Sequence, residues 1–437
     1  MKFNLNDYLY PYQIIKLYRS LQKSMYFSKE QLLDIQNIKL RIIIDHAYNN
    51  VPYYKELFDR NGLKPEDIQT VKDLVYIPVL TKDTLRKRYD DLIANNYKMF
   101  RPYNNSTSGS TGTPLHFLQD NNTRVANFAF FWRTWQLAGY RTYMRWAQVD
   151  NMFMPDGNSI WHYNRSLNSL QISACALDDT NCGRIVDKLN RFKPKIVRGF
   201  PSALYLLAVY IQKYDFDISL NLISIVTHAE TLHRHQRSLI ENVFQCKVFD
   251  VYSLWEAVCI ISECENQVKH QHMEYSAIEI LDDNNLPVEL GETGEITATS
   301  FYNFAMPFIR YKTRDLASIS NSQCQCGKKH LVVKEIDGRI EDLLVTPEGK
   351  KIGRMSHVFR NLNGFDYAQI IQNQIDLLEV FLVRNELFQE DSLMLLEKKL
   401  RKTVGSKIRI KFVFVNEIKP SSNGKRRLVV NNMERKI

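Results

Sequence analysis

Short apolar segments alternate with helix-like segments between residues 195 and 252, and this alternation limits the fold more than any other feature of the chain. The apolar segments are 196–197, 222–226 and 246–251, and the helix-like segments between them are 203–212 and 234–244. Strands that alternate with helices are typical of βαβ units, in which the strands lie parallel and the helices cover the sheet. The pattern therefore predicts a region built on a parallel sheet.

The regions on either side follow other patterns. Residues 1–100 place apolar side chains at three- and four-residue spacing between prolines, which predicts a helical leader. Residues 275–335 alternate with period two and contain turn pairs such as Thr293-Gly294, which predicts antiparallel strands. The last part of the chain, from residue 343, has strand-like and helix-like segments of its own.

A chain of 437 residues is too long for one compact domain, so we predict two. The fold class is α/β, or α+β overall. The large N-terminal domain, residues 1–340, combines mixed parallel sheets with helices. The small C-terminal domain, residues 341–437, is α+β.

The charge of the chain favours anionic partners. There are 58 Lys and Arg against 48 Asp and Glu, which gives a formal net charge of 58 − 48 = +10. No nucleic-acid-binding signature accompanies these scattered residues, so we expect no nucleic-acid partner, and nucleotide phosphate suffices as the anion. No apolar run approaches the roughly 20 residues of a membrane span, and the N-terminus has no secretory signal, so we expect a cytoplasmic protein.

A loop rich in hydroxyl groups and glycine precedes the apolar, aromatic segment 125–137. Its residues are Thr107, Ser108, Gly109, Ser110, Thr111, Gly112, Thr113 and Pro114. The two glycines let backbone N–H groups approach an anion closely and the hydroxyl groups add donors, so the loop 107–114 can wrap a polyphosphate. It lacks the Gly-Lys-Ser/Thr ending of a P-loop. The alternative is a solvated linker of the same composition.

This loop resembles the phosphate-binding loop of the adenylate-forming enzymes, the superfamily of acyl- and aryl-coenzyme A synthetases and peptide-synthetase adenylation domains. Further motifs that resemble those of the superfamily follow in the same order, so that the likeness spans residues 107–425. The resemblance implies that residues 107–113 bind the phosphates of ATP. It also implies that the small C-terminal domain is mobile.

The segment 250–256 resembles the Tyr-Gly-x-x-Glu motif of the superfamily, with Ser253 where glycine is usual. The resemblance assigns Tyr252 to stacking on adenine, Asp250 to the adenine amino group and Glu256 to the magnesium ion that bridges the phosphates. Carboxylate and phosphate oxygens are the ligands that Mg²⁺ prefers. The alternative is a buried tyrosine beside a surface glutamate.

Two more segments complete the implied nucleotide site. The segment 227–232 resembles the family segment that passes beside the purine, and it adds Ala229 and Glu230, with Val251, to the expected AMP contacts. The segment 306–315 resembles the motif Pro-x-x-Arg-Tyr-x-Thr-x-Asp, with Arg314 in place of the common glycine. The resemblance implies that Asp315 accepts hydrogen bonds from both ribose hydroxyls.

The segment 337–342 resembles the hinge motif Gly-Arg-x-Asp-Asp. The resemblance implies that Arg339 contacts ribose or phosphate and that the small domain rotates at Glu341, where the family more often has Asp or Lys.

The segment 420–425 resembles the C-terminal motif that ends in the adenylation lysine, Lys425. A flexible ammonium group suits the neutralisation of both the carboxylate and the α-phosphate. The resemblance thus gives catalytic roles to Lys425, Glu256 and Arg339. The alternative for Lys425 is a solvated basic tail.

Seven cysteines, an odd number, argue against a disulfide framework. Cys324 and Cys326 lie in a polar turn, and Cys264, His270 and His272 lie upstream. Four such ligands suit tetrahedral Zn²⁺. We predict a structural zinc site formed by Cys264, His272, Cys324 and Cys326, with His270 as the alternative to His272, and phenylacetate–coenzyme A ligases resemble the chain in these positions. The other alternative is cysteines that bind no metal.

The segment 192–202 and the short total length resemble phenylacetate–coenzyme A ligases and their relatives encoded near capsular-polysaccharide pathways. The resemblance implies that a carboxylic acid attacks ATP, releases pyrophosphate and forms an acyl-adenylate, whose acyl group then passes to coenzyme A. An amine or sugar acceptor in surface-polysaccharide synthesis and a nonenzymatic nucleotide-binding relative remain as alternatives. A homodimer is common among such relatives.

We expect the acid pocket in the regions 125–165 and 199–202. His162 and Arg165 are candidates to meet a second polar group on the substrate, and a surface role is the alternative for each.

Overall fold

The computed structural model describes residues 5–107, 114–141, 144–151, 159–165, 167–340, 343–352, 355–359, 362, 364–421 and 425–433. The chain folds into two compact units. The first unit consists of Met1–Gly139 and Phe249–Ile336, and the second consists of Tyr140–Val248 and Asp337–Ile437. The chain therefore passes from one unit to the other three times, and each unit combines segments that are far apart in the sequence.

The first unit begins with helices and ends with strands. Its helices are α1 (Leu5–Ser24), α2 (Lys29–Asn50), α3 (Pro52–Arg60), α4 (Lys82–Lys87) and α5 (Asn121–Leu137). Its strands are β1 (Tyr103–Ser106), β2 (His116–Gln119), β9 (Ile260–Glu263), β10 (Lys269–Gln271), β11 (Ser276–Leu281), β12 (Thr293–Ser300) and β13 (Tyr311–Ser320). Strands β8 (Lys247–Ser253) and β14 (Val332–Arg339) each begin in one unit and end in the other. The predicted helical leader is confirmed.

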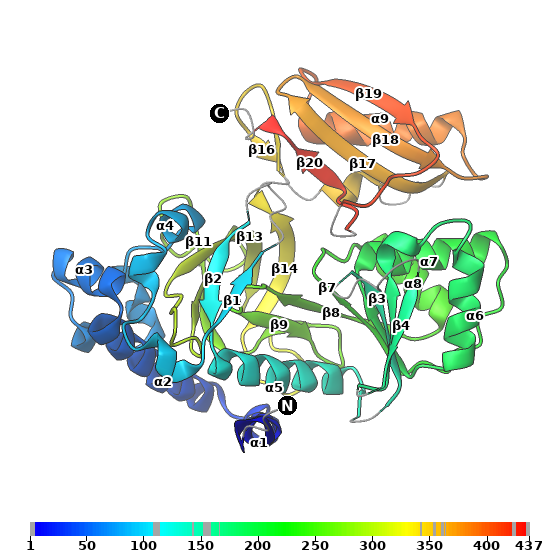
Figure 1. Cartoon of the computed structure of the whole chain (residues 1–437). Coiled ribbons are helices and arrows are strands. Elements are labelled where there is room, and N and C mark those ends of the chain that lie inside the picture. The colour runs from blue at the N-terminus through cyan, green and yellow to red at the C-terminus, as the bar shows by residue number, and fades with distance from the viewer. Residues whose placement is uncertain are drawn as a thin grey trace. The chain divides into compact units, whose positions relative to one another are not determined.

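The sheet of the first unit has the strand order β11-β12-β13-β14-β10-β9-β8. Its register is antiparallel, for example from Ser276 opposite Ser300 to Leu281 opposite Glu295. The prediction of antiparallel strands in 275–335 is confirmed. Helix α5 lies across β9 (Figure 1) and packs beside α1.

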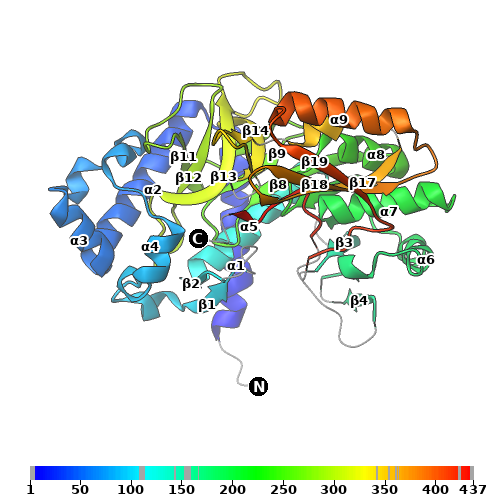
Figure 2. The same ribbon diagram turned by 90° about the horizontal axis from the view of Figure 1, so that it is seen from above.

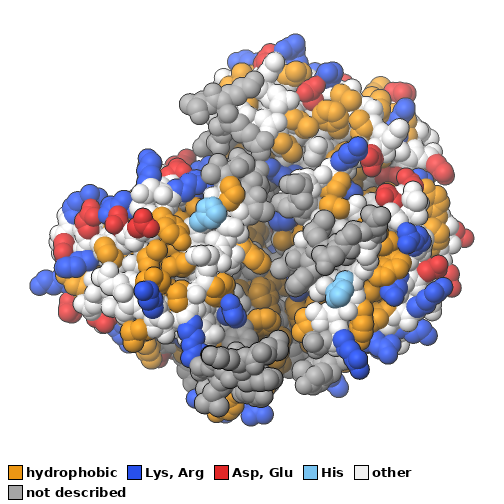
Figure 3. Space-filling model, in the orientation of Figure 1, with side chains coloured by type: hydrophobic (Ala, Val, Ile, Leu, Met, Phe, Trp, Pro, Cys, Tyr) orange, Lys and Arg blue, Asp and Glu red, His pale blue; other side chains and the backbone are white. Residues whose placement is uncertain are grey.

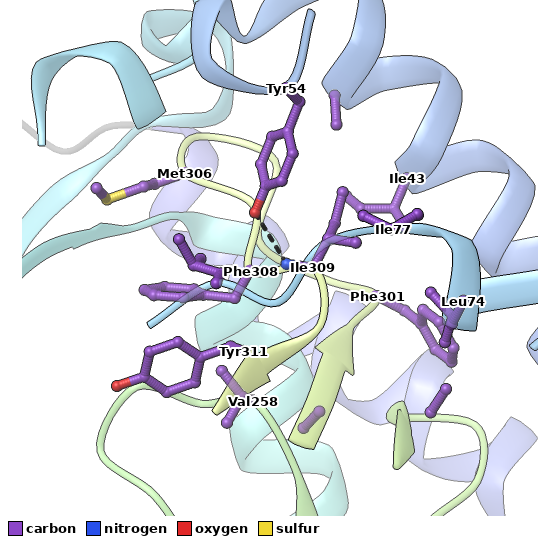
Figure 4. Packing of buried hydrophobic residues seen from close by; sticks show 14 of the residues in the cluster. Ile43, Tyr54, Leu74, Ile77, Val258, Phe301, Met306, Phe308, Ile309 and Tyr311 are labelled. Atoms are coloured by element: carbon purple, nitrogen blue, oxygen red, sulfur yellow. Dashed lines mark hydrogen bonds between the residues drawn. The ribbon is translucent and has the colours of Figure 1, made fainter. Parts of the chain in front are cut away.

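The main core of the first unit joins the helical leader to the irregular segment that precedes β13. Tyr54 of α3 is fully buried against it, and its hydroxyl donates to the carbonyl of Pro307 (3.0 Å) and accepts from the amide of Ile309 (3.0 Å). Figure 4 shows the Tyr54 ring directed at this segment, next to Met306 and Phe308. The helical leader thereby fixes the backbone that leads into Tyr311 and Asp315.

The second unit contains the parallel sheet. Its elements before residue 249 are β3 (Trp146–Asp150), β4 (Trp161–Asn164), β5 (Ser169–Ser173), α6 (Cys182–Phe192), β6 (Ile196–Gly199), α7 (Pro201–Lys213), β7 (Ser224–His228) and α8 (Arg234–Phe244). The strand order is β7-β6-β3-β5-β4, with β4 alone antiparallel to its neighbour within this part of the sheet. The predicted parallel strands and the helices between them are confirmed.

The described residues from 343 to 433 form a four-stranded sheet, a separate two-stranded sheet and one long helix. The elements are β15 (Leu344–Val345), β16 (Lys351–Ile352), β17 (Phe365–Gln374), β18 (Leu377–Arg384), α9 (Glu390–Val404), β19 (Arg409–Phe414) and β20 (Val429–Asn431). The sheet order is β19-β18-β17-β20, and α9 covers one face of it (Figure 2). Leu396 and Leu400 of α9 are fully buried in this core. The predicted α+β character is confirmed, whereas the limit at residue 341 and the mobility of this part stay predictions.

On the face drawn in Figure 3, Lys and Arg side chains are scattered, and acidic side chains accompany them mainly in the upper half. Within the described part of the chain, no helix combines the length and the apolar character that a membrane crossing needs.

Replacing Tyr54 with Phe tests the link between the leader and the 306–311 segment. We expect the free energy of unfolding to fall by about 1–3 kcal/mol, because the buried groups of Pro307 and Ile309 lose their partner. Urea unfolding measures the change. Tyr76, which is 61% exposed, supplies the matched control Tyr76→Phe, and equal stability of the two variants would contradict this account.

Candidate functional site

The predicted phosphate loop connects the two strands of a hairpin. Strands β1 and β2 pair in antiparallel register from Tyr103 opposite Gln119 to Ser106 opposite His116. Thr107 closes the base of the loop, because its amide donates to the carbonyl of Leu115 (3.0 Å) and its hydroxyl accepts from the Leu115 amide (3.1 Å). Residues 108–113, which carry the rest of this prediction, lie outside the described residues.

Trp255 joins this hairpin to the segment after β8. Its indole nitrogen donates to Asn105 Oδ1 (2.6 Å), and its carbonyl accepts from Gln119 Nε2 (2.9 Å). The base of the loop and the predicted magnesium ligand Glu256 are therefore held side by side within the first unit. Trp255 was not among the predicted site residues, although its place directly before the predicted ligand Glu256 is a signal in the sequence.

Two hydrogen bonds connect the end of β8 to β13. The hydroxyl of Tyr252 donates to Asp315 Oδ2 (2.7 Å), and the hydroxyl of Tyr311 donates to Glu256 Oε1 (3.1 Å). Burial, followed by the Asp315 carboxylate, raises the pKa of Tyr252 well above its usual value, so the hydroxyl stays protonated and donates. Asp315 and Glu256 are 6% and 4% exposed. The structure thus brings three of the predicted site residues together.

Asp250 lies on the same strand, but its carboxylate is engaged with Lys269. The Lys269 ammonium lies 3.0 Å from Asp250 Oδ2 and 3.3 Å from Glu263 Oε1, and Glu263 in turn accepts from the Asp250 amide (2.9 Å). A polar cluster on the neighbouring strands β8, β9 and β10 therefore holds Asp250, next to Val251.

Ser253 and Arg314, which stand where the superfamily motifs usually have glycine, differ in backbone conformation. Ser253 continues the extended strand β8, where any residue fits. Arg314 has φ of 70°, in the left-handed region that glycine adopts most readily, and its amide donates to Glu295 Oε1 (2.8 Å). The β12–β13 register shifts between Glu295 and Thr297, next to Arg314. This irregularity in the pairing of β12 and β13 lies where the backbone of β13 changes conformation, just before Asp315.

The second unit carries further predicted nucleotide-site residues. Ala229, directly after β7, has φ of 66°, and Glu230 follows it. The Glu230 carboxyl accepts from the amide (3.0 Å) and the hydroxyl (3.1 Å) of Ser202 at the start of α7, and also from the amide of Arg426 (3.2 Å). Burial raises the pKa of Glu230. Neither Ser202 nor Arg426 was predicted as a contact of this residue.

Lys425 lies beside the same strand end. Its ammonium donates to the Ala229 carbonyl (2.8 Å) and lies 5.6 Å from the centre of the Phe200 ring. The amide and the hydroxyl of Ser421 both donate to the Lys425 carbonyl, at 2.9 and 2.8 Å, which closes the loop that carries the lysine. Arg339 ends β14, whereas the predicted hinge residue Glu341 lies outside the described residues.

Four potential metal ligands meet in the first unit: Cys264, His270, Cys324 and Cys326, whose ligand atoms all lie within 4.8 Å of one another. The Cys264 and Cys324 sulfurs are 3.6 Å apart, and Cys326 Sγ lies 3.5 Å from His270 Nε2. Tetrahedral ligands at zinc–sulfur and zinc–nitrogen bond lengths lie about 3.5–3.8 Å apart. The Nδ1 of His270 lies 3.3 Å from the His330 carbonyl, which leaves Nε2 directed at the cysteines.

The choice of His272 as the ligand needs correction, because both of its ring nitrogens have other partners. Nδ1 accepts from Arg133 Nε (3.0 Å) and Nε2 bonds the Ser262 hydroxyl (2.7 Å). Burial and then Arg133 lower the pKa of His272 far below its usual value, so the ring is neutral and no lone pair remains for a metal. His270, the alternative, is the histidine beside the cysteines.

The neighbours of His272 form a buried ionic cluster. The guanidinium of Arg133 on α5 donates to both carboxylate oxygens of Glu274, at 2.7 and 3.0 Å. His330 is 6% exposed and lies in the same cluster, 3.8 Å from Glu274.

A family model described as the CapK C-terminal domain matches residues 344–432. Protein CapK of Staphylococcus aureus is 28% identical over 414 residues, which cover 92% of this chain and 90% of that protein. A phenylacetate-coenzyme A ligase of Thermus thermophilus is 25% identical over 323 residues, which cover 72% of each chain.

The fold is that of a solved 2-hydroxyisobutyryl-CoA ligase in the postadenylation state. The TM-score is 0.76 at 18% identity, over 94% of this chain and 92% of that chain. The predicted fold class is confirmed.

Replacing Glu230 with Ala tests the connection between β7 and the Lys425 segment. We expect the Arg426 amide to exchange with deuterium about tenfold faster or more, because a hydrogen bond to a carboxylate contributes about 1.5–3 kcal/mol. Hydrogen–deuterium exchange read by mass spectrometry measures this. Glu386→Ala, at an exposed position of the same unit, is the control, and unchanged exchange at Arg426 would refute the connection.

Proposed function

We propose that this protein activates a carboxylic acid. The relatives above confirm the resemblance to adenylate-forming enzymes of the phenylacetate–coenzyme A ligase and CapK group. ATP and the acid react to an acyl-adenylate and pyrophosphate, and the acyl group then passes to coenzyme A. The observation that carries the proposal is the meeting of three distant motifs in the first unit. The hairpin base, the Tyr252–Glu256 segment and the β13 residue Asp315 are joined there by direct hydrogen bonds.

Within the first unit, the described residues suit a nucleotide. Tyr252 offers an aromatic face for adenine, held in place by its bond to Asp315, and Asp315 offers a carboxylate for the ribose hydroxyls. The loop 107–113, whose base at Thr107 closes the hairpin, is the proposed phosphate contact. Val251 and Ser253 are further proposed AMP contacts in the first unit. Ala229, Glu230 and Arg339, which belong to the second unit, stay predicted AMP contacts.

Glu256 is the proposed magnesium ligand. It is almost fully buried, and one of its oxygens accepts from Tyr311, which orients the carboxylate. A buried carboxylate beside bound phosphates suits a hard cation. When bound, Mg²⁺ would neutralise phosphate charge, while the protein side chains hold the reactants in line.

Lys425 is the proposed catalytic residue of the first half-reaction. Its ammonium supplies positive charge for the reacting carboxylate and the α-phosphate, where negative charge builds up in the transition state. No side-chain nucleophile or general base is required, since the carboxylate of the acid is itself the nucleophile. Rotation at Glu341 would then withdraw Lys425 before thioester formation, a gating step by domain motion.

Coenzyme A is the proposed acceptor because the relatives that carry an activity in their names are coenzyme A ligases. The comparisons do not favour an amine or sugar acceptor. A role in surface-polysaccharide synthesis, a homodimer and a cytoplasmic location stay predictions.

We further propose that Cys264, His270, Cys324 and Cys326 bind a structural zinc ion. The separations of their ligand atoms fit a tetrahedron, and the His330 carbonyl orients the imidazole. The set joins the β9–β10 turn to the segment between β13 and β14.

Replacing Lys425 with Ala tests the first half-reaction. Acid-dependent pyrophosphate exchange should fall by about 10²–10³-fold or more, since the charge that stabilises the transition state is lost. Transfer to coenzyme A from preformed acyl-adenylate should stay nearly intact. Lys419→Ala, in the same segment and 81% exposed, is the control. An equal loss in both half-reactions would contradict the assigned role.

The zinc proposal predicts different metal contents for two neighbouring histidine variants. His270→Asn should lose the metal, whereas His272→Asn should keep about one zinc per chain and lose stability instead, because His272 bonds Arg133 and Ser262. Metal analysis and thermal unfolding of the purified proteins measure both. Retention of zinc in His270→Asn, or none in the unmodified protein, would refute the site.

A further inference from the structure

The two faces of the parallel sheet in the second unit differ in chemistry. One face lies in the apolar core with α6, α7 and α8, through Ala147, Val149, Leu170, Ile172, Val197 and Ile225. Parallel strands are usually apolar on both faces, because helices cover both. Here the other face carries the buried residues Gln148, Asp150 and Gln171 and the half-buried residues Arg198 and His228, which need a separate explanation.

The strand register aligns these polar side chains. Gln148 on β3 lies opposite Gln171 on β5 and Arg198 on β6. Asp150 follows at the end of β3, and His228 ends β7. We name Gln148, Asp150, Gln171, Arg198 and His228 the polar row. His162, one of the two polar candidates from the sequence, lies opposite Gln171 but is exposed, as is Arg165.

Most of the polar row is connected internally. Gln148 Nε2 donates to Asp150 Oδ1 (2.5 Å), and His228 Nε2 lies 3.2 Å from Asp150 Oδ2 and 3.3 Å from an Arg198 nitrogen. Burial and then Arg198 lower the pKa of His228, so its ring is neutral near pH 7. The charges of Asp150 and Arg198 therefore balance, and the row as a whole is neutral.

Gln171 has a donor without a partner. The side chain is 3% exposed, and its Nε2 finds no hydrogen-bond partner in the part of the chain that the structure describes. A buried amide donor left in this state costs about 1–3 kcal/mol, unless a ligand or water completes it. The row thus offers a donor that a bound molecule can use.

The position of the polar row indicates which molecule binds to it. In open α/β sheets, ligands bind at the carboxyl ends of the strands, where Asp150 and His228 lie. Lys425 reaches the same edge, because its ammonium bonds the carbonyl of Ala229, the residue after His228. A carboxylate at Lys425 would place the rest of its molecule against the polar row.

We propose that the polar row binds the non-reacting part of the carboxylic acid and that this part carries hydroxyl groups and no charge. The inference rests on the proposed function, because it concerns the acid that Lys425 helps to activate. It narrows the substrate to a hydroxylated acid.

The donor and acceptor content of the row favours hydroxyl groups. Gln171 and Arg198 donate and Asp150 accepts, and a hydroxyl group both donates and accepts. A second carboxylate or an ammonium group would add an unbalanced charge to a buried site that is already neutral. An alkyl or aryl group would leave the Gln171 donor without a partner among the described residues.

Matched acid pairs test the inference in the unmodified enzyme. Pyrophosphate release is measured for 3-hydroxybutanoate and butanoate, 4-hydroxybutanoate and butanoate, and 4-hydroxyphenylacetate and phenylacetate. We expect kcat/KM for at least one hydroxylated acid to exceed that of its partner by about 100-fold or more, since a site built to bond a hydroxyl rejects the analogue that lacks it.

Gln171→Leu supplies the second test. Because the donor has no partner among the described residues, its removal should leave thermal stability unchanged or raised, while the hydroxyl preference falls about tenfold or more. Gln372→Leu is the matched control. Gln372 is also fully buried, but it bonds both backbone groups of Val345, so its loss should lower stability and leave the preference unchanged.

Three outcomes separate the two proposals. Pyrophosphate release that favours the unsubstituted acids, or treats the pairs alike, overturns the hydroxyl inference and leaves the proposed function in place. A Gln171→Leu variant that loses stability but keeps its preference also overturns the inference. Absence of pyrophosphate release with every acid overturns the proposed function itself, and the inference with it.

Discussion

The bond between the Tyr252 hydroxyl and Asp315 is the contact on which the nucleotide half of the protein depends. It joins the end of β8 to β13, two strands with three others between them in the sheet order. Burial raises the pKa of Tyr252, so its hydroxyl keeps the proton that it donates to Asp315. With Trp255 bonded to the β1–β2 hairpin, it makes one rigid set of three sequence motifs.

The second unit depends on a different constraint, the division of its sheet into an apolar and a polar face. The apolar face gains the free energy of burial against α6, α7 and α8. The polar face gains no comparable stabilisation, since it buries the Gln171 amide donor, which has no hydrogen-bond partner among the described residues. Proteins retain such arrangements where a ligand uses them, and the strand ends beside Lys425 are such a place.

Periodicity in the sequence predicted the parallel and antiparallel regions because both depend on local alternation of side chains. The grouping of residues 1–139 with 249–336 has no local signal, since it depends on which surfaces pack. The metal ligands show the same limit. Spacing in the sequence does not distinguish His270 from His272 as the ligand. His270 lies on β10, whereas His272 follows the end of this strand and is bonded by Arg133, 139 positions away. Motif order predicted Asp315 and Glu256 in one site, and the structure connects each of them by a hydrogen bond between β13 and the end of β8. The partners of Glu230, Ser202 and Arg426, became visible only with the fold.

The β9–β10 hairpin has a consequence for the chemistry at the far end of its strands. Its turn carries Cys264, while Glu263 and Lys269 on its stem hold Asp250. Cys324 and Cys326 follow the strand of Asp315. A metal ion bound by the four ligands would therefore cross-link the two segments that position these carboxylates. Removal of the metal by a chelator would then weaken nucleotide binding, although none of the proposed nucleotide contacts is a metal ligand.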